Sequence, residues 1–215
     1  MKTKYTNQEK KWSGEFGKEY TLRHVYKPED LDKLYTKYFG VSRTELNKEF
    51  LGKLNRSIKI LEVGSNIGNQ LVSLQKIGFK NLYGIEINKE AIELSKSVTK
   101  DINFVWGSAL DIPFKDNYFD LVFTSGLLIH ISPSDVKKVI REIHRVTKQY
   151  IWGLEYYADK YEEVVYRGKK NMLWKTNFPK LYIGLFPNLK LVKEKMVQYL
   201  DNKNVDKMFL FKKKK

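Results

Sequence analysis

The chain of 215 residues contains no cysteine, and none of its apolar runs is long enough to cross a bilayer. The lack of cysteine excludes disulfides, thiolate metal sites and cysteine nucleophiles. A membrane-spanning helix needs about 20 mostly apolar residues, and the first twelve residues are polar without a signal-like core. The sequence also contains no cluster of histidine, aspartate and glutamate residues with the spacing of metal ligands, so we predict no metal site. We expect a cytoplasmic protein that does not enter the membrane.

Arginine is also scarce, although the chain is strongly basic. Lysine and arginine number 40 against 25 acidic residues, a net charge of +15, but only six of the 40 are arginine. Positive charge favours a nucleic-acid partner. Arginine is the usual reader of phosphates and guanine edges, however, and the lysines are spread along the chain apart from the tail at 212–215. We therefore favour a small-molecule partner and keep nucleic acid as the alternative. The oligomeric state is not indicated.

From residue 57 onward, short apolar strands alternate with helical patterns, which is typical of a mostly parallel sheet. The predicted strands are 58–63, 81–87, 102–106, 119–124 and 149–155, and the predicted helices are 68–77, 89–99 and 133–146, with Ser132 as the N-cap of the last. An antiparallel hairpin of 189–200 and 205–213 follows. We predict a Rossmann-like α/β fold for 57–215, with seven strands in one sheet. Residues 1–56 are predicted to form a helical N-terminal cap.

The strand and turn at 59–69, together with a second strand that ends in a carboxylate, are typical of a nucleoside pocket. Such pockets form at the carboxyl ends of parallel strands, where backbone N–H groups face the ligand and an acid holds the ribose hydroxyls. The separation of Gly64 from Glu86 is close to the roughly 20 residues expected. The predicted cofactor-binding residues here are Glu62, Gly64, Ser65, Asn66, Gly68, Asn69, Glu86, Ile87 and Asn88.

This turn resembles the E-x-G-x-G-x-G turn of class I S-adenosylmethionine methyltransferases. Asn66 occupies the middle glycine position, and asparagine tolerates a left-handed backbone well. Residues 107–123 resemble the G-D-A-x-x-L-P-F…F-D-x-V segment of the same superfamily. In that pattern an aspartate accepts from the adenine amino group, whereas here the position holds Ser108. The resemblance implies S-adenosylmethionine as cofactor, S-adenosylhomocysteine as product, and adenine contacts from Ser108, Ala109 and Leu110.

The loop after the fourth strand is expected to lie at the sulfonium, next to the acceptor. Thr124, Ser125 and Gly126 are assigned to the cofactor. The loop lacks the (D/N)-P-P-(Y/F) sequence of many N-methyltransferases, which argues against base and glutamine acceptors. His130 is the candidate general base, because an imidazole can take a proton from a hydroxyl or an ammonium near neutral pH. A histidine that only caps a loop is the alternative.

The fifth strand ends in Glu155-Tyr156-Tyr157, and an acceptor-side insertion follows at 156–188. We predict Glu155 and Tyr157 as catalytic partners of His130. Tyr156, Tyr166 and Arg167 are predicted to bind the acceptor, because an arginine fork can hold a carboxylate or phosphate. The alternative for Arg167 is a solvated loop residue.

Aromatic residues recur at helical spacing near the N-terminus, at Trp12, Phe16 and Tyr20. They favour either packing against the core or a lid that covers the cofactor and excludes water. We include Tyr20 in the cofactor site on the second interpretation.

Several blocks of the sequence together resemble methyltransferases associated with pseudaminic acid biosynthesis. The blocks are 12–21, 60–69, 83–88, 119–133, Glu155-Tyr-Tyr and Tyr166-Arg-Gly. The resemblance implies a sugar or acidic-sugar acceptor of bacterial surface or flagellar glycan assembly, methylated on oxygen or nitrogen. An RNA methyltransferase and a non-catalytic partner protein that binds S-adenosylmethionine are the alternatives.

Overall fold

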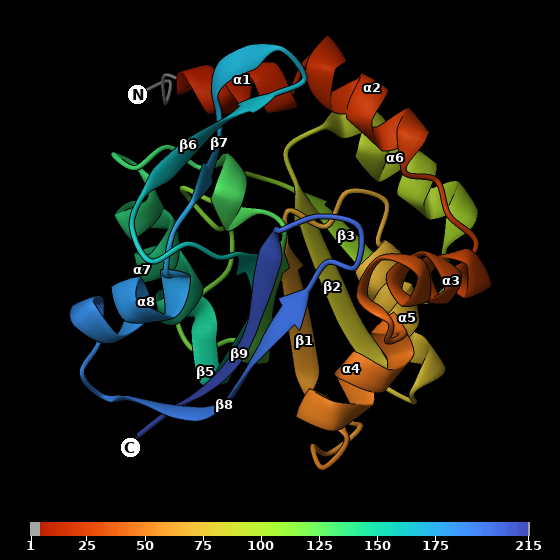
Figure 1. Cartoon of the computed structure of the whole chain (residues 1–215). Helices are drawn as coiled ribbons and strands as arrows, with labels where there is room; N and C mark the ends of the chain where they lie inside the picture. Colours follow the sequence, from red (N-terminus) through yellow and green to blue (C-terminus); the bar gives the residue numbers. More distant parts are fainter. Residues whose placement is uncertain (1–4, 215) are drawn as a thin grey trace.

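The computed structural model of the protein describes residues 5–214. Its centre is a seven-stranded sheet in the order β3-β2-β1-β4-β5-β9-β8 (Figure 1). Strands β1 to β5 pair in parallel, β9 pairs antiparallel with β5, and β8 pairs antiparallel with β9. The strands are β1 (Lys59–Val63), β2 (Asn81–Glu86), β3 (Asn103–Trp106), β4 (Phe119–Ser125), β5 (Thr147–Tyr156), β8 (Leu189–Gln198) and β9 (Val205–Lys213). The predicted fold class and terminal hairpin are confirmed.

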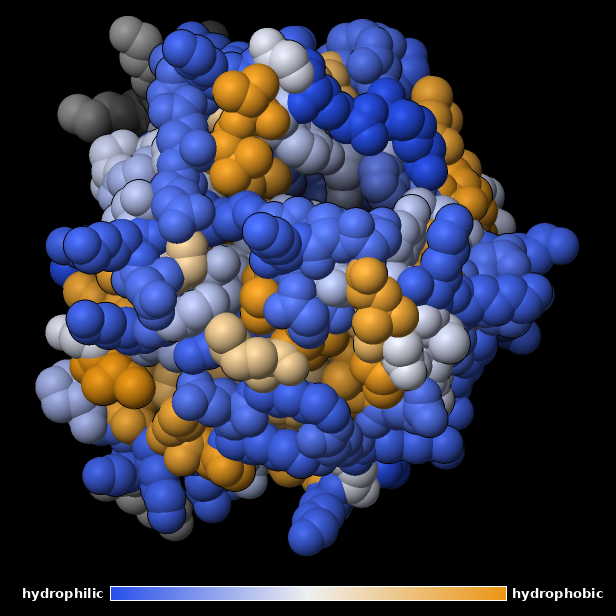
Figure 2. All heavy atoms as spheres, in the orientation of Figure 1, coloured by the Kyte–Doolittle hydropathy of each residue, from blue (hydrophilic) through white to orange (hydrophobic). Residues whose placement is uncertain are grey.

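Helices cover both faces of the sheet, because its strands are apolar on both sides. On one face, α7 (Val136–Val146) and α8 (Phe178–Leu185) share a buried cluster with Leu61 and Val122. On the other, α4 (Arg43–Leu51) and α5 (Asn69–Lys76) share a cluster with Ile60 and Phe123. Hydrophilic side chains cover most of the surface drawn in Figure 2, with apolar patches between them. No helix within residues 5–214 has the length and apolar character to cross a membrane.

The N-terminal helices divide into two parts. Helix α3 (Pro28–Phe39) precedes α4, whose Leu46 and Leu51 are fully buried in the second core cluster. Helices α1 (Asn7–Trp12) and α2 (Glu15–Arg23) instead lie above the carboxyl ends of the parallel strands, with α6 (Lys89–Val98) beside α2 (Figure 1). Helices α1 and α2 thus have the position of a lid, while α4 is part of the core.

Two departures from the predicted elements occur on the acceptor side. The insertion forms a separate hairpin of β6 (Glu162–Tyr166) and β7 (Lys169–Lys175), followed by α8, none of which we predicted. Helix α7 begins at Val136 with Asp135 as its N-cap, so the predicted N-cap at Ser132 is wrong. The Ser132 carbonyl accepts from the N–H groups of Asp135 and Val136, and the Ser132 hydroxyl donates to the Asp135 carboxylate. These bonds form a turn ahead of the helix.

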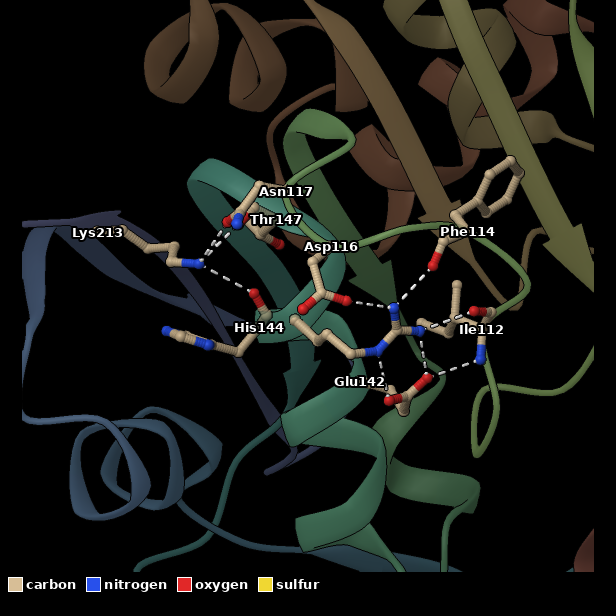
Figure 3. Close-up of polar contacts among 9 residues, drawn as sticks. Ile112, Phe114, Asp116, Asn117, Glu142, His144, Thr147 and Lys213 are labelled. Atoms are coloured by element: carbon tan, nitrogen blue, oxygen red, sulfur yellow. Dashed lines mark hydrogen bonds and ion pairs between the residues drawn. The ribbon is translucent and has the colours of Figure 1, made fainter. Parts of the chain in front are cut away.

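The connection between β3 and β4 is fixed to α7 by one arginine (Figure 3). The Arg145 guanidinium donates to the carbonyls of Phe114 and Ile112, at 2.7 and 2.8 Å. It also pairs with Asp116 at 2.9 Å and with Glu142 at 2.7 Å. Glu142 in turn accepts from the Ile112 N–H at 2.9 Å. This network holds in place the loop that carries residues 108–110.

Candidate functional site

A cavity of about 260 Å³ lies where the parallel strands end. Its floor is formed by the turns after β1, β2, β3 and β4, and its cover by α1, α2 and α3. All the residues predicted to bind the cofactor line it, except Gly68 and Thr124. Gly68 is the N-cap of α5, and Thr124 is buried within β4. The three segments chosen from the sequence therefore meet around one cavity.

The turn after β1 has the left-handed backbone that the sequence predicts. Gly64 has a φ of 72° and Asn66 a φ of 47°. The N–H groups of Gly64 and Ser65 both donate to the Ile85 carbonyl, at 2.9 and 3.0 Å, which ties the turn to β2. A Cβ on Gly64 would lie 2.6 Å from a methyl of Leu127, so a larger residue requires Leu127 to move in addition to adopting the left-handed backbone.

Glu86 ends β2 and faces the cavity. Its carboxylate accepts from the backbone N–H groups of Asn66 at 2.9 Å, Ile87 at 2.8 Å and Asn88 at 2.8 Å. Burial raises its pKa, and these three hydrogen bonds oppose that rise. A carboxylate offers about four acceptor positions, so room remains for a donor from the cavity. Glu86 both shapes the turn and presents an acceptor to a ligand.

Four buried polar atoms that belong to cavity-lining residues have no partner. They are the donor Trp12 Nε1 and the oxygens Glu62 Oε2, Ser65 Oγ and Gln70 Oε1. Burial raises the pKa of Glu62 well above its ordinary value, although Arg43 opposes this. Buried acceptors without donors cost free energy, so a fitting ligand supplies donors. An amino-acid ammonium and ribose hydroxyls are such donors, and the residues therefore fit S-adenosylmethionine.

Helices α1 and α2 meet at an aromatic cluster next to the cavity. The Trp12 ring lies 5.1 Å from Phe16 and 5.3 Å from Tyr20, across a break in the helix at residues 13–14. Trp12 and Tyr20 line the cavity. The predicted aromatic face is thus formed by two short helices, and its aromatic side chains both pack on one another and cover the cavity.

Side-chain hydrogen bonds attach this cover to the turns below it. Thr21 Oγ1 donates to Asn66 Oδ1 at 2.8 Å, and Asn69 Nδ2 donates to the carbonyl of His24 at 2.7 Å. Asn88 caps α6 with its Oδ1 and donates through Nδ2 to the Trp12 carbonyl at 3.0 Å. The residues that shape the cofactor turns are therefore the same residues that hold the cover.

His130 lies in the short helix η1 (Leu128–His130) and lines the cavity. Its Nδ1 is 2.7 Å from the Met172 carbonyl, which can only accept, so Nδ1 carries the proton and Nε2 has a free lone pair. The rings of Trp12 and Tyr166 lie 4.6 and 5.1 Å from its own. Burial lowers the pKa of His130 to about 4. The ring is thus neutral at physiological pH.

The other two predicted catalytic residues do not line the cavity. Glu155 is buried beneath the loop and accepts from the N–H groups of Leu127 at 3.2 Å and Ile129 at 3.4 Å. Burial raises the pKa of Glu155 to about 7. The Tyr157 hydroxyl donates to Asp159, outside the cavity. The Glu155 carboxylate is instead taken up by the N–H groups of the loop, and Tyr157 lies beyond the end of β5, where strand geometry does not fix the direction of its side chain.

The three predicted acceptor-binding residues also lie outside the cavity lining. Tyr156 packs against Tyr199, with ring centroids 5.7 Å apart. Tyr166 contacts the His130 ring at the edge of the cavity. Arg167 is exposed in the β6–β7 turn with a φ of 50°. Tyr166 is thus in contact with a cavity residue of the acceptor side.

Sequence reasoning missed most of the contribution of the N-terminal helices. Glu9 lines the cavity and accepts a hydrogen bond from the Ser108 hydroxyl, 99 positions along the chain. Nothing local in the sequence indicates such a contact. The other lining residues that were missed include Thr6, Gln8, Thr21, His24, Tyr26, Tyr35, Gln70 and Asp135.

A shallow second groove adjoins the cavity and shares four of its lining residues. Lys10, Lys11 and Lys170 line it together with Asn171 and Trp174. Within residues 5–214, no group of three or more His, Asp or Glu side chains is placed to hold a metal ion. The cavity itself offers a neutral imidazole, buried carboxylates and backbone N–H groups.

Comparison with known proteins supports the methyltransferase interpretation. A family model described as a methyltransferase domain matches residues 61–150. The uncharacterized methyltransferase YcgJ of Bacillus subtilis is 28% identical over 96 residues, covering 42% of this chain and 37% of that protein. Norajmaline N-methyltransferase of Rauvolfia serpentina is 31% identical over 93 residues, covering 40% of this chain and 31% of that protein. The chain thus spans about a third of the length of these curated relatives.

A solved structure resembles the whole chain. It is a Burkholderia thailandensis 1,6-didemethyltoxoflavin-N1-methyltransferase with bound S-adenosylhomocysteine, with a TM-score of 0.67 at 12% identity. The alignment covers 100% of this chain and 94% of that one. At this identity the likeness shows the fold. Together with the family match at residues 61–150, it shows that this chain has the class I methyltransferase fold and is similar in sequence to methyltransferase domains.

Proposed function

We propose that the protein transfers the methyl group of S-adenosylmethionine to an oxygen or nitrogen of a small polar acceptor. The observation that carries this proposal is the meeting of the turns after β1, β2 and β4 around one cavity, with a neutral histidine at its edge. The cofactor supplies an activated methyl group when bound, and the protein supplies alignment and a water-poor site. The norajmaline and didemethyltoxoflavin enzymes carry small-molecule acceptors in their names, which agrees with this class.

The residues on the cofactor side of the cavity bind the cofactor and orient it. Glu86 accepts from the ligand with the acceptor position that its backbone donors leave free. Glu62 and Ser65 offer the unpartnered atoms already described, and the Gly64 N–H is tied to β2. Helices α1 and α2 keep water away from the bound donor because their aromatic side chains cover the cavity.

His130 orients the acceptor. Its Nε2 accepts a hydrogen bond from an acceptor O–H or N–H, because Nδ1 is committed as a donor to Met172. With a pKa of about 4 the ring is a weak base, so it accepts the proton as the new bond forms rather than beforehand. Glu155 acts as a positioning residue, since it holds the N–H groups of the loop that carries His130.

We further propose that the acceptor is an anionic sugar of the pseudaminic acid type, used in bacterial surface or flagellar glycans. The groove beside the cavity supports this because three lysines line it, together with asparagine and serine side chains. Arg167 lies in the turn that precedes β7, the strand that carries Lys170 and Asn171 of this groove. Lysine and arginine side chains bind carboxylates, and sugar hydroxyls pair with polar side chains.

The proposal is tested in two steps with the full chain. Calorimetric titration with S-adenosylhomocysteine should show binding that Glu86→Ala weakens. Methyl transfer from labelled S-adenosylmethionine is then measured against nucleotide-activated acidic sugars, free acidic sugars, neutral sugars and bulk RNA. Transfer to the acidic sugars alone supports the proposal. Transfer to neutral sugars alone would leave a methyltransferase but contradict the anionic acceptor.

Two other functions are outcomes of the same experiment. Transfer to RNA, with a steep dependence on salt, would indicate an RNA methyltransferase that uses the positive charge of the chain. Binding without any transfer would indicate a partner protein. A [4+2]-cyclase also shares this fold, at a TM-score of 0.63 and 14% identity, so fold alone does not fix the reaction.

A further inference from the structure

We propose that Glu9 of helix α1 supplies the carboxylate that recognises the adenine amino group of the cofactor. This inference rests on the proposed function, because it assigns a residue to the adenine end of the same cavity. In the sequence pattern an aspartate does this, but here the position holds Ser108, which has no charge. A carboxylate from the N-terminal helix is hydrogen-bonded to Ser108.

The contacts of Ser108 show how the replacement is arranged. Its hydroxyl oxygen accepts from the Leu110 N–H at 3.0 Å, and its proton is donated to Glu9 Oε1. The carboxylate of Glu9 is therefore one hydrogen bond away from the position that an aspartate at 108 would fill. Glu9, Ser108, Ala109 and Leu110 all line the cavity. The site thus has a carboxylate at this end, although β3 and its loop do not provide it.

Glu9 keeps capacity for a ligand after its internal hydrogen bonds are counted. Oε2 accepts from the Thr6 N–H at 2.8 Å, and Oε1 accepts from Ser108. Each carboxylate oxygen has two lone pairs, so one position on each oxygen is free. An amino group offers donors and a keto group offers none. A carboxylate here consequently favours adenine over hypoxanthine, which carries a keto oxygen in place of the amino group.

A purely structural role for Glu9 is the competing explanation. Glu9 and Thr6 form a capping box at the start of α1, and a capping box by itself stabilises the helix. The chain offers a matched control, because Ser42 and Glu45 form the same capping box at the start of α4. Glu45 does not line the cavity. Loss of a cap and loss of a ligand contact can therefore be separated.

The experiment measures binding of S-adenosylhomocysteine and of its inosine analogue by calorimetry. The variants are Glu9→Ala, Glu9→Gln, Glu45→Ala and the double variant Glu9→Ala/Ser108→Asp. Loss of a hydrogen bond to a charged group corresponds to about a ten- to hundred-fold weaker affinity. We expect the Glu9→Ala variant to bind S-adenosylhomocysteine about ten- to hundred-fold more weakly than the wild type. Its affinity for the inosine analogue should change little.

The remaining variants are expected to separate the two roles. Glu9→Gln retains the capping box, since glutamine serves there too, and should still reduce the preference for adenine several-fold. Glu45→Ala should bind both nucleosides as the wild type does. Ser108→Asp should restore the preference in the Glu9→Ala background. The proposal is overturned if Glu9→Ala and Glu9→Gln weaken the binding of both nucleosides equally. It is also overturned if they weaken the binding of neither.

The outcome also distinguishes this inference from the proposed function. If the wild-type protein binds neither nucleoside, the cofactor assignment itself fails. If it binds S-adenosylhomocysteine and Glu86→Ala weakens that binding, but the Glu9 variants keep the wild-type preference, only the role of Glu9 is contradicted. If Glu9→Ala does not fold, Glu9→Gln still gives the test because it keeps the cap.

Discussion

The two ends of the cavity are built in different ways. At the cofactor end, backbone N–H groups and carboxylates face each other, and Glu86 alone accepts from three N–H groups. At the acceptor end, the walls are aromatic rings around His130, and the carboxylate of Glu155 is buried under the loop. The first end is suited to binding a polar ligand tightly. The second is suited to holding an acceptor atom in a water-poor place.

The difference shows how one fold accommodates varied acceptors. The cofactor end depends on strand termini, whose positions the sheet fixes. The acceptor end depends on η1 and on the insertion with β6, β7 and α8, which lie outside the seven-stranded sheet. Loops and insertions vary more freely than strands. Changes at the two ends should therefore have separable effects on cofactor binding and on turnover.

The largest expected effect is at the cofactor end. Glu86→Ala removes an acceptor from the ligand and leaves the N–H groups of Asn66, Ile87 and Asn88 without a partner. We expect the affinity for S-adenosylhomocysteine to fall ten-fold or more, about 1.5–3 kcal/mol for a charged hydrogen bond. Calorimetric titration measures it, with Glu90→Ala on the exposed side of α6 as control. Unchanged affinity would remove Glu86 from the site.

The next effect should appear only at the acceptor end. His130→Ala removes the Nε2 acceptor, and we expect turnover to fall by about ten- to hundred-fold, at the low end of general-base effects because of the lowered pKa. Cofactor affinity should stay nearly intact. His130→Phe keeps an aromatic ring against Trp12 and should lose turnover equally. If His130→Phe retains full turnover, the ring serves packing only.

The buried carboxyls behind the acceptor end predict a dependence of stability on pH. The pKa of Glu155 is raised to about 7 and that of Asp206 to about 8, first by burial. The folded state then holds more protons than the unfolded state above about pH 4.5, so stability is highest in acid and falls as pH rises towards about 8.

The matching variant is Glu155→Gln, which removes one of these carboxyls. We expect its free energy of unfolding to decrease less than that of the wild type between about pH 5 and pH 8, by on the order of 1 kcal/mol. Urea denaturation at several pH values measures this difference. Parallel curves for the two proteins would show that Glu155 keeps an ordinary pKa in the folded state.

The smallest expected effect comes from a substitution outside both ends of the cavity. Arg145→Lys keeps the charge but loses the planar fork that joins Glu142 to the carbonyls of Ile112 and Phe114 (Figure 3). We expect a loss of about 1 kcal/mol in unfolding free energy with nearly unchanged cofactor affinity. Arg141→Lys, on the exposed side of the same helix, serves as control. A ten-fold loss of affinity in Arg145→Lys would mean that the β3–β4 connection controls the cofactor end.

The cofactor end could be predicted because its information is contiguous in the sequence. Each strand, turn and helix start lies within a dozen residues, and parallel strands bring their carboxyl ends to one edge. Gly64, Asn66 and Glu86 were found in this way, and they line the cavity. The substitution at Ser108 was also visible, but its partner Glu9 was not, because 99 residues separate them.

The acceptor end could not be predicted to the same degree. Strands β6 and β7 form a two-stranded hairpin outside the main sheet, and β6 is mostly exposed, so its sequence lacks a clear apolar alternation. Tyr157 was predicted to face the cavity from its place after β5, but its hydroxyl pairs with Asp159 instead. The direction of a side chain beyond the end of a strand depends on tertiary contacts, which local pattern does not contain.

The double role of Asn88 has a consequence for the catalytic cycle. One side chain both starts α6 and grips the carbonyls of Trp12 and Gly14, at 3.0 and 3.2 Å, at the joint between α1 and α2. Movement of α1 and α2 away from the cavity breaks those contacts. The residue that starts α6 therefore also resists opening of the cover over the cavity.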